Sequence, residues 1–287
     1  MTNRKLICSE NLHQIVTAPI EYKMRFDITY VVIDTLNHTL SARALELSNQ
    51  RFPAEKILIF SDKSDDWNGR EIIKIPQIKS TKDYNSIIFY ELPKRLKSDF
   101  ALFIQYDGFV LSGDLFSDQY LNWDFIGAPW PHQSEFKVGN GGFSLRSKKL
   151  VTCIQKYLLP TDLHTAEDVV ICRHLRTRLE DGEGVRFAPQ KIAEMFSFEM
   201  KKPSFETFGF HGLFHLPELM LDDTEYLLRH LQPQSVVKFF RSFQRACEKL
   251  PDEQRKMFDD YCMKHHSEML FHAQNNVIKQ SKSEQIM

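Results

Sequence analysis

Buried strands that alternate with helices constrain the fold more than any other feature of this sequence. Residues 27–34 (DITYVVID) are almost entirely apolar and β-branched, which predicts a buried strand. Residues 39–51 follow with the apolar spacing of a helix. Further strands are predicted at 56–60, 71–75 and 99–111. A helix is predicted at 84–96, where Pro93 would kink or shorten it. This alternation predicts an α/β fold with a mixed, mainly parallel sheet flanked by helices.

The second half of the chain changes character twice. Residues 122–146 combine aromatics, glycines and prolines. Short strands are predicted at 123–126 and 142–146, a helix at 167–179, and late strands at 185–189 and 195–199. From about Asp222 the pattern is helical to the end. We therefore expect an N-terminal segment (1–24), an α/β domain (25–221) and a C-terminal helical extension (222–287).

The C-terminal extension contains an amphipathic helical pattern with basic residues. Five apolar residues recur at helical spacing: Val236, Phe240, Phe243, Cys247 and Leu250. Such a pattern predicts a helix packed on the α/β domain or on a second subunit. The alternative is a basic amphipathic helix that rests on anionic lipid. Peripheral membrane contact and a homodimer through these helices are thus the two partner hypotheses for this segment.

Charge and cysteine content exclude several classes of protein. Lys and Arg number 37 against 38 Asp and Glu, a net charge of −1, which argues against a nucleic-acid binder. The five cysteines are odd in number and form no CxxC pair, so neither a disulfide framework nor a zinc site is predicted. No secretory signal or membrane-spanning stretch is recognisable. We therefore expect a cytoplasmic protein, which would reach a membrane-bound substrate from the inner face.

Two motifs carry residues suited to binding a ligand. Asp107 lies where an apolar strand meets a glycine, and it either contacts a ligand or metal or caps a local turn. The run GNGGFSLR (139–146) places three glycines within four residues, which costs backbone entropy. Glycines there permit a positive φ or the close approach of a ligand, and Asn140 adds a side-chain amide. A tight hairpin turn is the alternative.

An acidic pair and two histidines complete the candidates. Glu167 and Asp168 open a predicted helix, where one acid caps the helix and the other remains available as a general base. His211 and His215 lie among aromatics and are either structural or, with Asp107, metal ligands. The chain lacks the HExxH, GxSxG and GxGxxG patterns, which argues against zinc hydrolysis, an α/β-hydrolase and a dinucleotide-binding domain.

Taken in order, these segments resemble a glycosyltransferase of GT-A type. The first two strands end in Ile33-Asp34-Thr35 and Phe60-Ser61-Asp62. They are followed by QYDGF (105–109), GNGGFSLR (139–146), AEDVV (166–170) and FGFH (208–211). The array is most similar to a bacterial family of GT-A-like proteins that share QxDGF, FIGAPW and GNGGFSLR. It is more distantly similar to the fringe and core-1 galactosyltransferase group. The resemblance covers roughly residues 25–216.

The resemblance implies a role for each matching residue. Asp168 is expected to deprotonate the acceptor hydroxyl, with Glu167 as the reserve candidate. Asp107 and His211 are expected to hold Mn²⁺ or Mg²⁺ at the donor diphosphate. The implied donor-binding residues are Asp34, Thr35, Arg43, Ser61, Asp62, Lys82, Gln105, Asp107 and Gly108. The implied lining of the donor sugar and acceptor is Trp130, Asn140, Gly141, Gly142 and Phe143. Stacking on sugar faces is expected of Trp123, Trp130 and Phe143, with core packing expected for at least one of them.

One position departs from the family pattern. Gln105 replaces the first acid of the Asp-x-Asp motif, and an amide oxygen is a poorer ligand for a hard cation than a carboxylate. Without a metal, Arg146 or Lys82 would have to neutralise the leaving diphosphate. The resemblance implies an inverting transfer of a sugar from a nucleotide-sugar donor to a hydroxyl of a glycan, a lipid-linked molecule or another acceptor. A non-catalytic sugar-binding module and a sugar nucleotidyltransferase are the alternatives.

Overall fold

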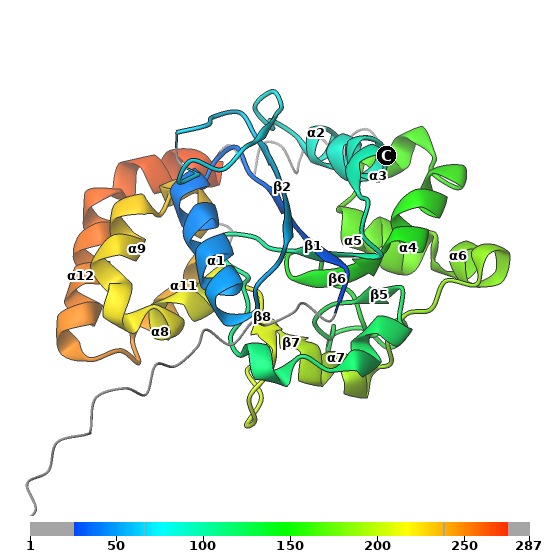
Figure 1. Ribbon diagram of the computed structural model, residues 1–287. Helices are drawn as coiled ribbons and strands as arrows, with labels where there is room; N and C mark the ends of the chain where they lie inside the picture. The colour runs from blue at the N-terminus through cyan, green and yellow to red at the C-terminus, as the bar shows by residue number, and fades with distance from the viewer. Residues whose placement is uncertain (1–25, 66, 238, 275–287) are drawn as a thin grey trace, which may run out of the picture.

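A six-stranded sheet forms the centre of the protein in the computed structural model, which describes residues 26–65, 67–237 and 239–274 (Figure 1). The strands are β1 (Ile28–Ile33), β2 (Lys56–Ser61), β3 (Ile73–Lys74), β4 (Phe100–Phe103), β5 (Phe125–Ile126) and β6 (Ser144–Ser147). Their order is β3-β2-β1-β4-β6-β5, and β1 to β4 pair in parallel. Strand β6 is antiparallel to both β4 and β5. The predicted mixed, mainly parallel sheet is thus confirmed.

Helices cover the sheet, and a short second sheet joins β7 (Ser197–Phe198) to β8 (Gly209–Phe210) in parallel. The α-helices are α1 (His38–Arg51), α2 (Thr81–Ser86), α3 (Leu92–Arg95), α4 (Lys148–Cys153), α5 (Glu167–Val169), α6 (Arg176–Glu183), α7 (Gln190–Phe196), α8 (Leu216–Leu219), α9 (Thr224–His230), α10 (Pro233–Val237), α11 (Phe240–Cys247) and α12 (Asp252–Lys264). Two π-helical turns, η1 (Ile87–Glu91) and η6 (Val170–His174), continue α2 and α5. The 3₁₀ turns are η2 (Gly113–Leu115), η3 (Asp118–Asn122), η4 (Ile154–Lys156), η5 (Pro160–His164), η7 (Leu213–His215) and η8 (Leu221–Asp223).

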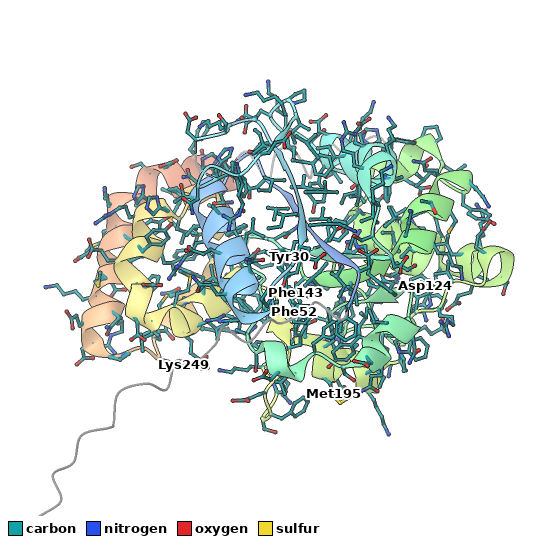
Figure 2. The ribbon with its side chains drawn as sticks, viewed as in Figure 1. Tyr30, Phe52, Asp124, Phe143, Met195 and Lys249 are labelled. Atoms are coloured by element: carbon teal, nitrogen blue, oxygen red, sulfur yellow. The ribbon has the colours of Figure 1, made fainter. Side chains whose placement is uncertain are left out.

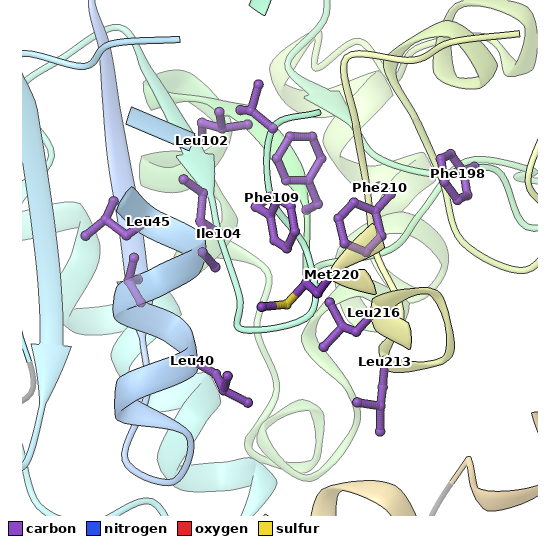
Figure 3. Packing of buried hydrophobic residues seen from close by; sticks show 14 of the residues in the cluster. Leu40, Leu45, Leu102, Ile104, Phe109, Phe198, Phe210, Leu213, Leu216 and Met220 are labelled. Atoms are coloured by element: carbon purple, nitrogen blue, oxygen red, sulfur yellow. The ribbon is translucent and has the colours of Figure 1, made fainter. Parts of the chain in front are cut away.

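Side chains that alternate along the strands divide the core into two layers. Tyr30 and Val32 of β1 belong to the cluster under α1, whereas Val31 and Ile33 belong to the cluster under α2 to α6. This alternation follows from the two-residue period of a strand. Figure 3 shows the first layer, where Leu40 and Leu45 of α1 face a group that includes Phe109, Phe210 and Met220. The mostly apolar sequence of β1 is explained because both of its faces are covered.

The helix predicted at 84–96 is divided into α2, the π turn η1 and α3. Within this stretch the backbone N–H of Leu92 donates to the carbonyl of Ile87, five residues earlier. Pro93 has no N–H to donate, and its ring would clash with a carbonyl four residues earlier in a regular helix. The wider π turn lies directly before Pro93, which is a common way to accommodate such a break.

Several predicted strands are shorter in the structure or absent from it: those at 71–75 and 123–126 are reduced to Ile73–Lys74 and Phe125–Ile126. The strand expected at 99–111 ends at Phe103, because the chain reverses between Gln105 and Gly108. Residues 185–189 form no strand; their one strand-like contact is a bridge between Phe187 and Phe125. Of the residues at 195–199, only Ser197–Phe198 form a strand, since α7 runs through Phe196.

The C-terminal helices pack against the same side of the sheet as α1 (Figure 1). Val236 and Phe243 are buried in the same apolar cluster as Leu40 and Leu45. Arg43 of α1 also bonds to Asp223, with Nη2 and Oδ2 2.8 Å apart. The prediction of a helix that packs on the α/β domain is therefore confirmed for α11. Among the described residues, no helix combines the length and apolarity that crossing a membrane requires.

Candidate active site

The chain reverses sharply after β4 and places two polar side chains at the end of the strand, those of Gln105 and the buried Asp107. Gln105 and Gly108 exchange backbone hydrogen bonds of 3.1 and 3.0 Å, which closes a tight turn around Asp107. The backbone N–H of Gly212 donates to the Asp107 carbonyl at 2.8 Å. This bond ties the turn to the segment after β8, about a hundred residues later. The bond therefore places QYDGF beside FGFH, the two segments that contain Asp107 and His211.

His211 lies at the centre of the polar cluster. Its Nε2 is 3.2 Å from Oε1 of Gln105 and 3.5 Å from Oδ1 of Asp107. Its Nδ1 is 3.1 Å from Oε1 of Glu199 and 2.9 Å from Nδ2 of Asn140. Burial alone would lower the pKa of His211, but the carboxylates of Asp107 and Glu199 outweigh it and raise that pKa to about 10. Two carboxylates therefore favour the imidazolium form.

The glycine-rich run lies directly against this histidine and the acidic pair. A Cβ on Gly142 would lie 2.0 Å from Nε2 of His211, and one on Gly141 would lie 1.8 Å from Oε1 of Glu167. Asn140 has a φ of +65°, and its Oδ1 accepts hydrogen bonds from the backbone N–H groups of Gly142 and Phe143. The glycines are thus required by the close approach of protein side chains, a reason that the sequence alone does not reveal.

The two adjacent acids at the start of α5 have different environments. Oε1 of Glu167 accepts a 2.6 Å hydrogen bond from Nη2 of Arg146, and both side chains are almost fully buried. Asp168 instead accepts hydrogen bonds from the backbone N–H groups of Gly141 (3.2 Å) and Val169 (2.8 Å). Burial, reinforced by the charge of Glu167, raises the pKa of Asp168 to about 6. A carboxylate with such a pKa is suited to general-base chemistry near neutral pH.

The side chain of Arg146 is buried and contacts Glu167 and the ring of Phe103. Its guanidinium carbon lies 3.8 Å from the centroid of the Phe103 ring, and the side chain is 1% exposed. Since Arg146 is enclosed and paired with Glu167, it does not reach solvent where a diphosphate would lie. The alternative role for Arg146 as a free counter-charge is therefore wrong.

Two residues of the cluster were not predicted. The Tyr84 hydroxyl accepts a 2.9 Å hydrogen bond from Nε2 of Gln105. Burial raises the pKa of Tyr84, and the negative charge of Glu167 raises it further, so the hydroxyl stays protonated. Glu199 lies in a segment interpreted as a strand, so its carboxylate beside His211 was missed. No local pattern marks either residue, because each meets its partner only through the tertiary fold.

The predicted residues at the ends of β1 and β2 bond mainly to the protein itself. Asp34 accepts hydrogen bonds from the backbone N–H groups of Leu36 and Asn37, both at 2.6 Å, and from the Ser41 hydroxyl. Oδ1 of Asp62 lies 2.6 Å from Nε2 of His38. The remaining two, Thr35 and Ser61, are buried, and each accepts from a backbone N–H, of Ile78 and Lys63 respectively. Their donor-binding role stays a prediction.

Arg43 and Lys82 lie apart from the residues that contact His211. Arg43 pairs with Glu46 and Asp223 on the side of α1 that faces the C-terminal helices. Lys82 lines a cavity of about 740 Å³ between β2, β3 and α2, and none of its lining residues belongs to the cluster around His211. Their assignment to the donor also stays a prediction.

The aromatic residues expected to stack on sugar faces are largely enclosed. Phe143, labelled near the centre of Figure 2, is fully buried, and its ring stacks on Phe196 at 5.4 Å. Trp130 is also buried and packs against Gly139. The expectation that at least one of these aromatics packs in the core is confirmed for Phe143, whose ring belongs to the first core layer. Trp123 is half-buried against the first core layer.

The cluster contains donor atoms that suit a hard divalent cation. Oδ1 of Asp107 is buried and accepts no hydrogen bond from the residues that the structure describes. Oε1 of Gln105 and Nε2 of His211 lie beside it. In the described part of the chain, no three or more His, Cys, Asp or Glu side chains gather as a metal site would require, so the set depends on the amide of Gln105. This carboxylate oxygen, which accepts no hydrogen bond from the described residues and lies 3.5 Å from Nε2 of His211, fits the predicted cation, whose binding is expected to be weak.

Several solved structures are similar to this chain in fold. A galactosyltransferase, LgtC, crystallised with donor and acceptor sugar analogues, is 10% identical with a TM-score of 0.38, covering 64% of this chain and 87% of LgtC. A mannosyltransferase from Pyrobaculum calidifontis, in complex with GDP-Man and Mn²⁺, is 10% identical with a TM-score of 0.41, covering 91% and 76%. A glycosyltransferase involved in glycosylation of the PBCV-1 major capsid is 9% identical with a TM-score of 0.40, covering 65% and 94%.

No curated protein matches the sequence. A family model matches the segment of the chain that contains most of the polar cluster. The matched segment begins after β2 and contains Gln105, Asp107, the glycine-rich run and the acidic pair, and it ends at His211. Residues 70–211 match the model of a family described as a protein of unknown function (DUF5672).

Proposed function

We propose that the protein is a glycosyltransferase that moves a sugar from a nucleotide-sugar donor to an acceptor hydroxyl with inversion. One observation carries the proposal. Asp107 contacts His211, His211 contacts Asn140 of the glycine-rich run, and Gly141 of that run donates to Asp168. Three segments far apart in the sequence thus join in one polar cluster. Transfer from an activated sugar requires a base near the group that holds the donor, and this chain of contacts supports those roles for Asp168 and Asp107.

Asp168 is the proposed general base. Its backbone hydrogen bonds from Gly141 and Val169 orient the carboxylate. It takes the proton of the acceptor hydroxyl as that oxygen attacks the anomeric carbon. The bond between the anomeric carbon and the diphosphate breaks, and the nucleoside diphosphate leaves with the bonding electrons. Glu167 is held by Arg146 and contributes its charge to the raised pKa of Asp168.

Asp107, Gln105 and His211 form the proposed site of Mn²⁺ or Mg²⁺. Such an ion, when bound, would offset the negative charge of the leaving diphosphate. His211 must lose its proton to coordinate a cation, because only neutral imidazole has a free lone pair. Glu199 on the other ring nitrogen orients the imidazole, as carboxylates do beside metal-binding histidines. Tyr84 holds the side chain of Gln105 through its hydroxyl.

Replacement of the base tests this proposal. Asp168→Asn should lower sugar transfer by about 10²–10⁴-fold, because the amide cannot accept the proton. Donor affinity should change by no more than about twofold. Asp181→Asn, an exposed site on α6, is the matched control. The donor is first identified by thermal shift with a panel of nucleotide sugars, with and without Mn²⁺.

The same measurements separate the alternatives. Near-normal turnover in Asp168→Asn would mean that this carboxylate is not the base. Tight donor binding without transfer or hydrolysis in the wild-type protein would indicate a non-catalytic sugar-binding module. Formation of a nucleotide sugar from a sugar phosphate and a nucleoside triphosphate would indicate a nucleotidyltransferase.

A further inference from the structure

A cavity of about 690 Å³ lies between the segment after β7 and helix α11, and we call it the basic cavity. Its charged or titratable lining residues are Lys201, Lys202, His215, Glu218, Arg245 and Lys249. Figure 2 labels Lys249 at the lower edge of the C-terminal helices. None of these residues was assigned a role in the proposed transfer reaction.

The basic cavity has an excess of positive charge. Lys202 pairs with Glu218, which cancels one charge of each sign. Burial lowers the pKa of His215, which favours the neutral ring. Lys201, Arg245 and Lys249 form no ion pair with any carboxylate of the described residues. Three like charges around one hollow repel one another, and a bound anion would remove that repulsion.

The positions of the cations suit a phosphate group. Arg245 lies on α11 and Lys249 two residues beyond its end, and both side chains line the basic cavity. Lys201 and Lys202 line the same cavity from the segment that follows β7. An Arg guanidinium and several ammonium groups are the usual partners of phosphate oxygens.

The basic cavity is connected to the candidate active site by the segment Glu199–Lys202. The Glu199 carboxylate contacts Nδ1 of His211, and its carbonyl bonds to the ring of His215. Three residues later the chain has reached Lys202, a span of at most about 11 Å. A further cavity of about 500 Å³ is lined by both Glu199 and Lys202, and also by Ser197, whose buried hydroxyl has no hydrogen-bond partner among the described residues.

We propose that the basic cavity binds a phosphate or diphosphate ester carried by the acceptor. This inference rests on the proposed function and names the class of acceptor: an anionic phosphate ester whose hydroxyl end reaches the active site. The phosphate belongs either to a lipid headgroup or to a soluble ester, and the two sources present the same oxygen atoms to the cations. Arg245 and Lys249 carry the binding.

Calorimetric titration with inorganic pyrophosphate at low salt tests the site in the full-length protein. Arg245→Gln/Lys249→Gln should weaken binding at least tenfold. Arg241→Gln/Lys256→Gln removes the same charge from exposed positions outside the cavity and should change affinity by less than twofold. If both variants bound pyrophosphate equally weakly, the loss of affinity would arise from overall charge alone, and the proposal would be overturned. Absence of pyrophosphate binding to the wild-type protein would overturn it as well.

Vesicle sedimentation distinguishes the two sources. Vesicles of phosphatidylcholine with phosphatidic acid are compared with phosphatidylcholine alone. Release of only the cavity variant from the phosphatidic acid vesicles would support a lipid source. Loss of pyrophosphate binding by that variant, with no vesicle binding by the wild-type protein, would support a soluble ester. Arg245→Gln/Lys249→Gln should keep the thermal shift that the nucleotide-sugar donor induces. If no nucleotide sugar stabilised the wild-type protein, the proposed function would be refuted, while the result of the pyrophosphate titration would still stand.

Discussion

At the residue scale, two neighbouring carboxylates acquire different properties from their surroundings. Glu167 and Asp168 are adjacent in sequence and both lie at the start of α5. The buried guanidinium of Arg146 pairs with Glu167, whereas Asp168 accepts its hydrogen bonds from backbone N–H groups in the described part of the chain. The pKa of Asp168 is raised because burial disfavours its charge and Glu167 repels it. The assignment of Asp168 as the base therefore depends on the ion pair that its neighbour Glu167 forms with Arg146.

The raised pKa of Asp168 predicts a pH dependence of activity. Since a base must be deprotonated, kcat/KM for sugar transfer should rise about tenfold per pH unit below pH 6 and level off above it. The folded protein binds this proton more tightly than the unfolded chain, whose carboxyl has a pKa near 3.8. Stability contributed by Asp168 should therefore be greatest below about pH 4 and fall by about 3 kcal/mol as the pH rises through 6.

Urea unfolding at pH 4.5 and pH 7.5 measures the stability part of this prediction. The fall in the free energy of unfolding from pH 4.5 to pH 7.5 should be smaller in Asp168→Asn, because this variant carries no titratable carboxyl at this position. A pH-rate profile without an inflection between pH 5 and 7 would contradict the assigned pKa.

At the scale of elements, the glycine-rich run acts as a spacer between α5 and the residue after β8. It brings Asn140 to His211 on one side and Gly141 to Asp168 on the other. The run has room for glycine only, because a Cβ on either Gly141 or Gly142 would overlap a side chain of the cluster. The π turn η6 after α5 continues the helix that carries the acidic pair.

Gly142→Ala should destabilise the fold by about 1–3 kcal/mol, because its methyl group would overlap His211. The test is a double-mutant cycle by urea denaturation with His211→Ala. Removal of the imidazole removes the clash, so the double variant should be less destabilised than the sum of the single variants. Strict additivity would show that the cost of Gly142→Ala arises elsewhere, for example in the backbone.

At the scale of the whole molecule, the α/β domain and the C-terminal helices share an apolar cluster. Phe243 of α11 is buried in the layer that also contains Leu40 and Leu45 of α1. Asn37 and Ser235 form a further hydrogen bond of 3.2 Å between the two parts. Because the two parts share one core, we expect them to unfold in one transition.

Phe243→Ala tests this shared core. The substitution should destabilise the protein by about 3–5 kcal/mol, as a buried ring is lost and a cavity is left. Phe271→Ala, where the ring is 61% exposed, is the control and should change stability by less than about 0.5 kcal/mol. Near-UV and far-UV circular dichroism should report the same midpoint in each variant. Two separate transitions would show that the C-terminal helices unfold independently.

Sequence patterns predicted the parts of this protein that depend on neighbouring residues. The apolar run at 27–34 and the periodicity at 39–51 predicted β1 and α1, since strand and helix periods are local properties. Local signals were weaker where the chain turns. Asp107-Gly108 indicated an interruption but not the full reversal at Gln105–Gly108, and the start of α7 after Pro189 was missed. Strand and helix type therefore followed from sequence, whereas their ends followed from turns and packing.

The sequence by itself also indicated most polar residues of the cluster, but neither Tyr84 nor Glu199. Their partners were decided only by the tertiary structure. Glu199 meets His211, Tyr84 meets Gln105, and Arg146 enters the core to neutralise Glu167. These contacts join residues between 12 and 21 positions apart, and no local pattern encodes them. They form because packing of the two core layers places the segments side by side, and this packing decides which carboxylate remains available for chemistry.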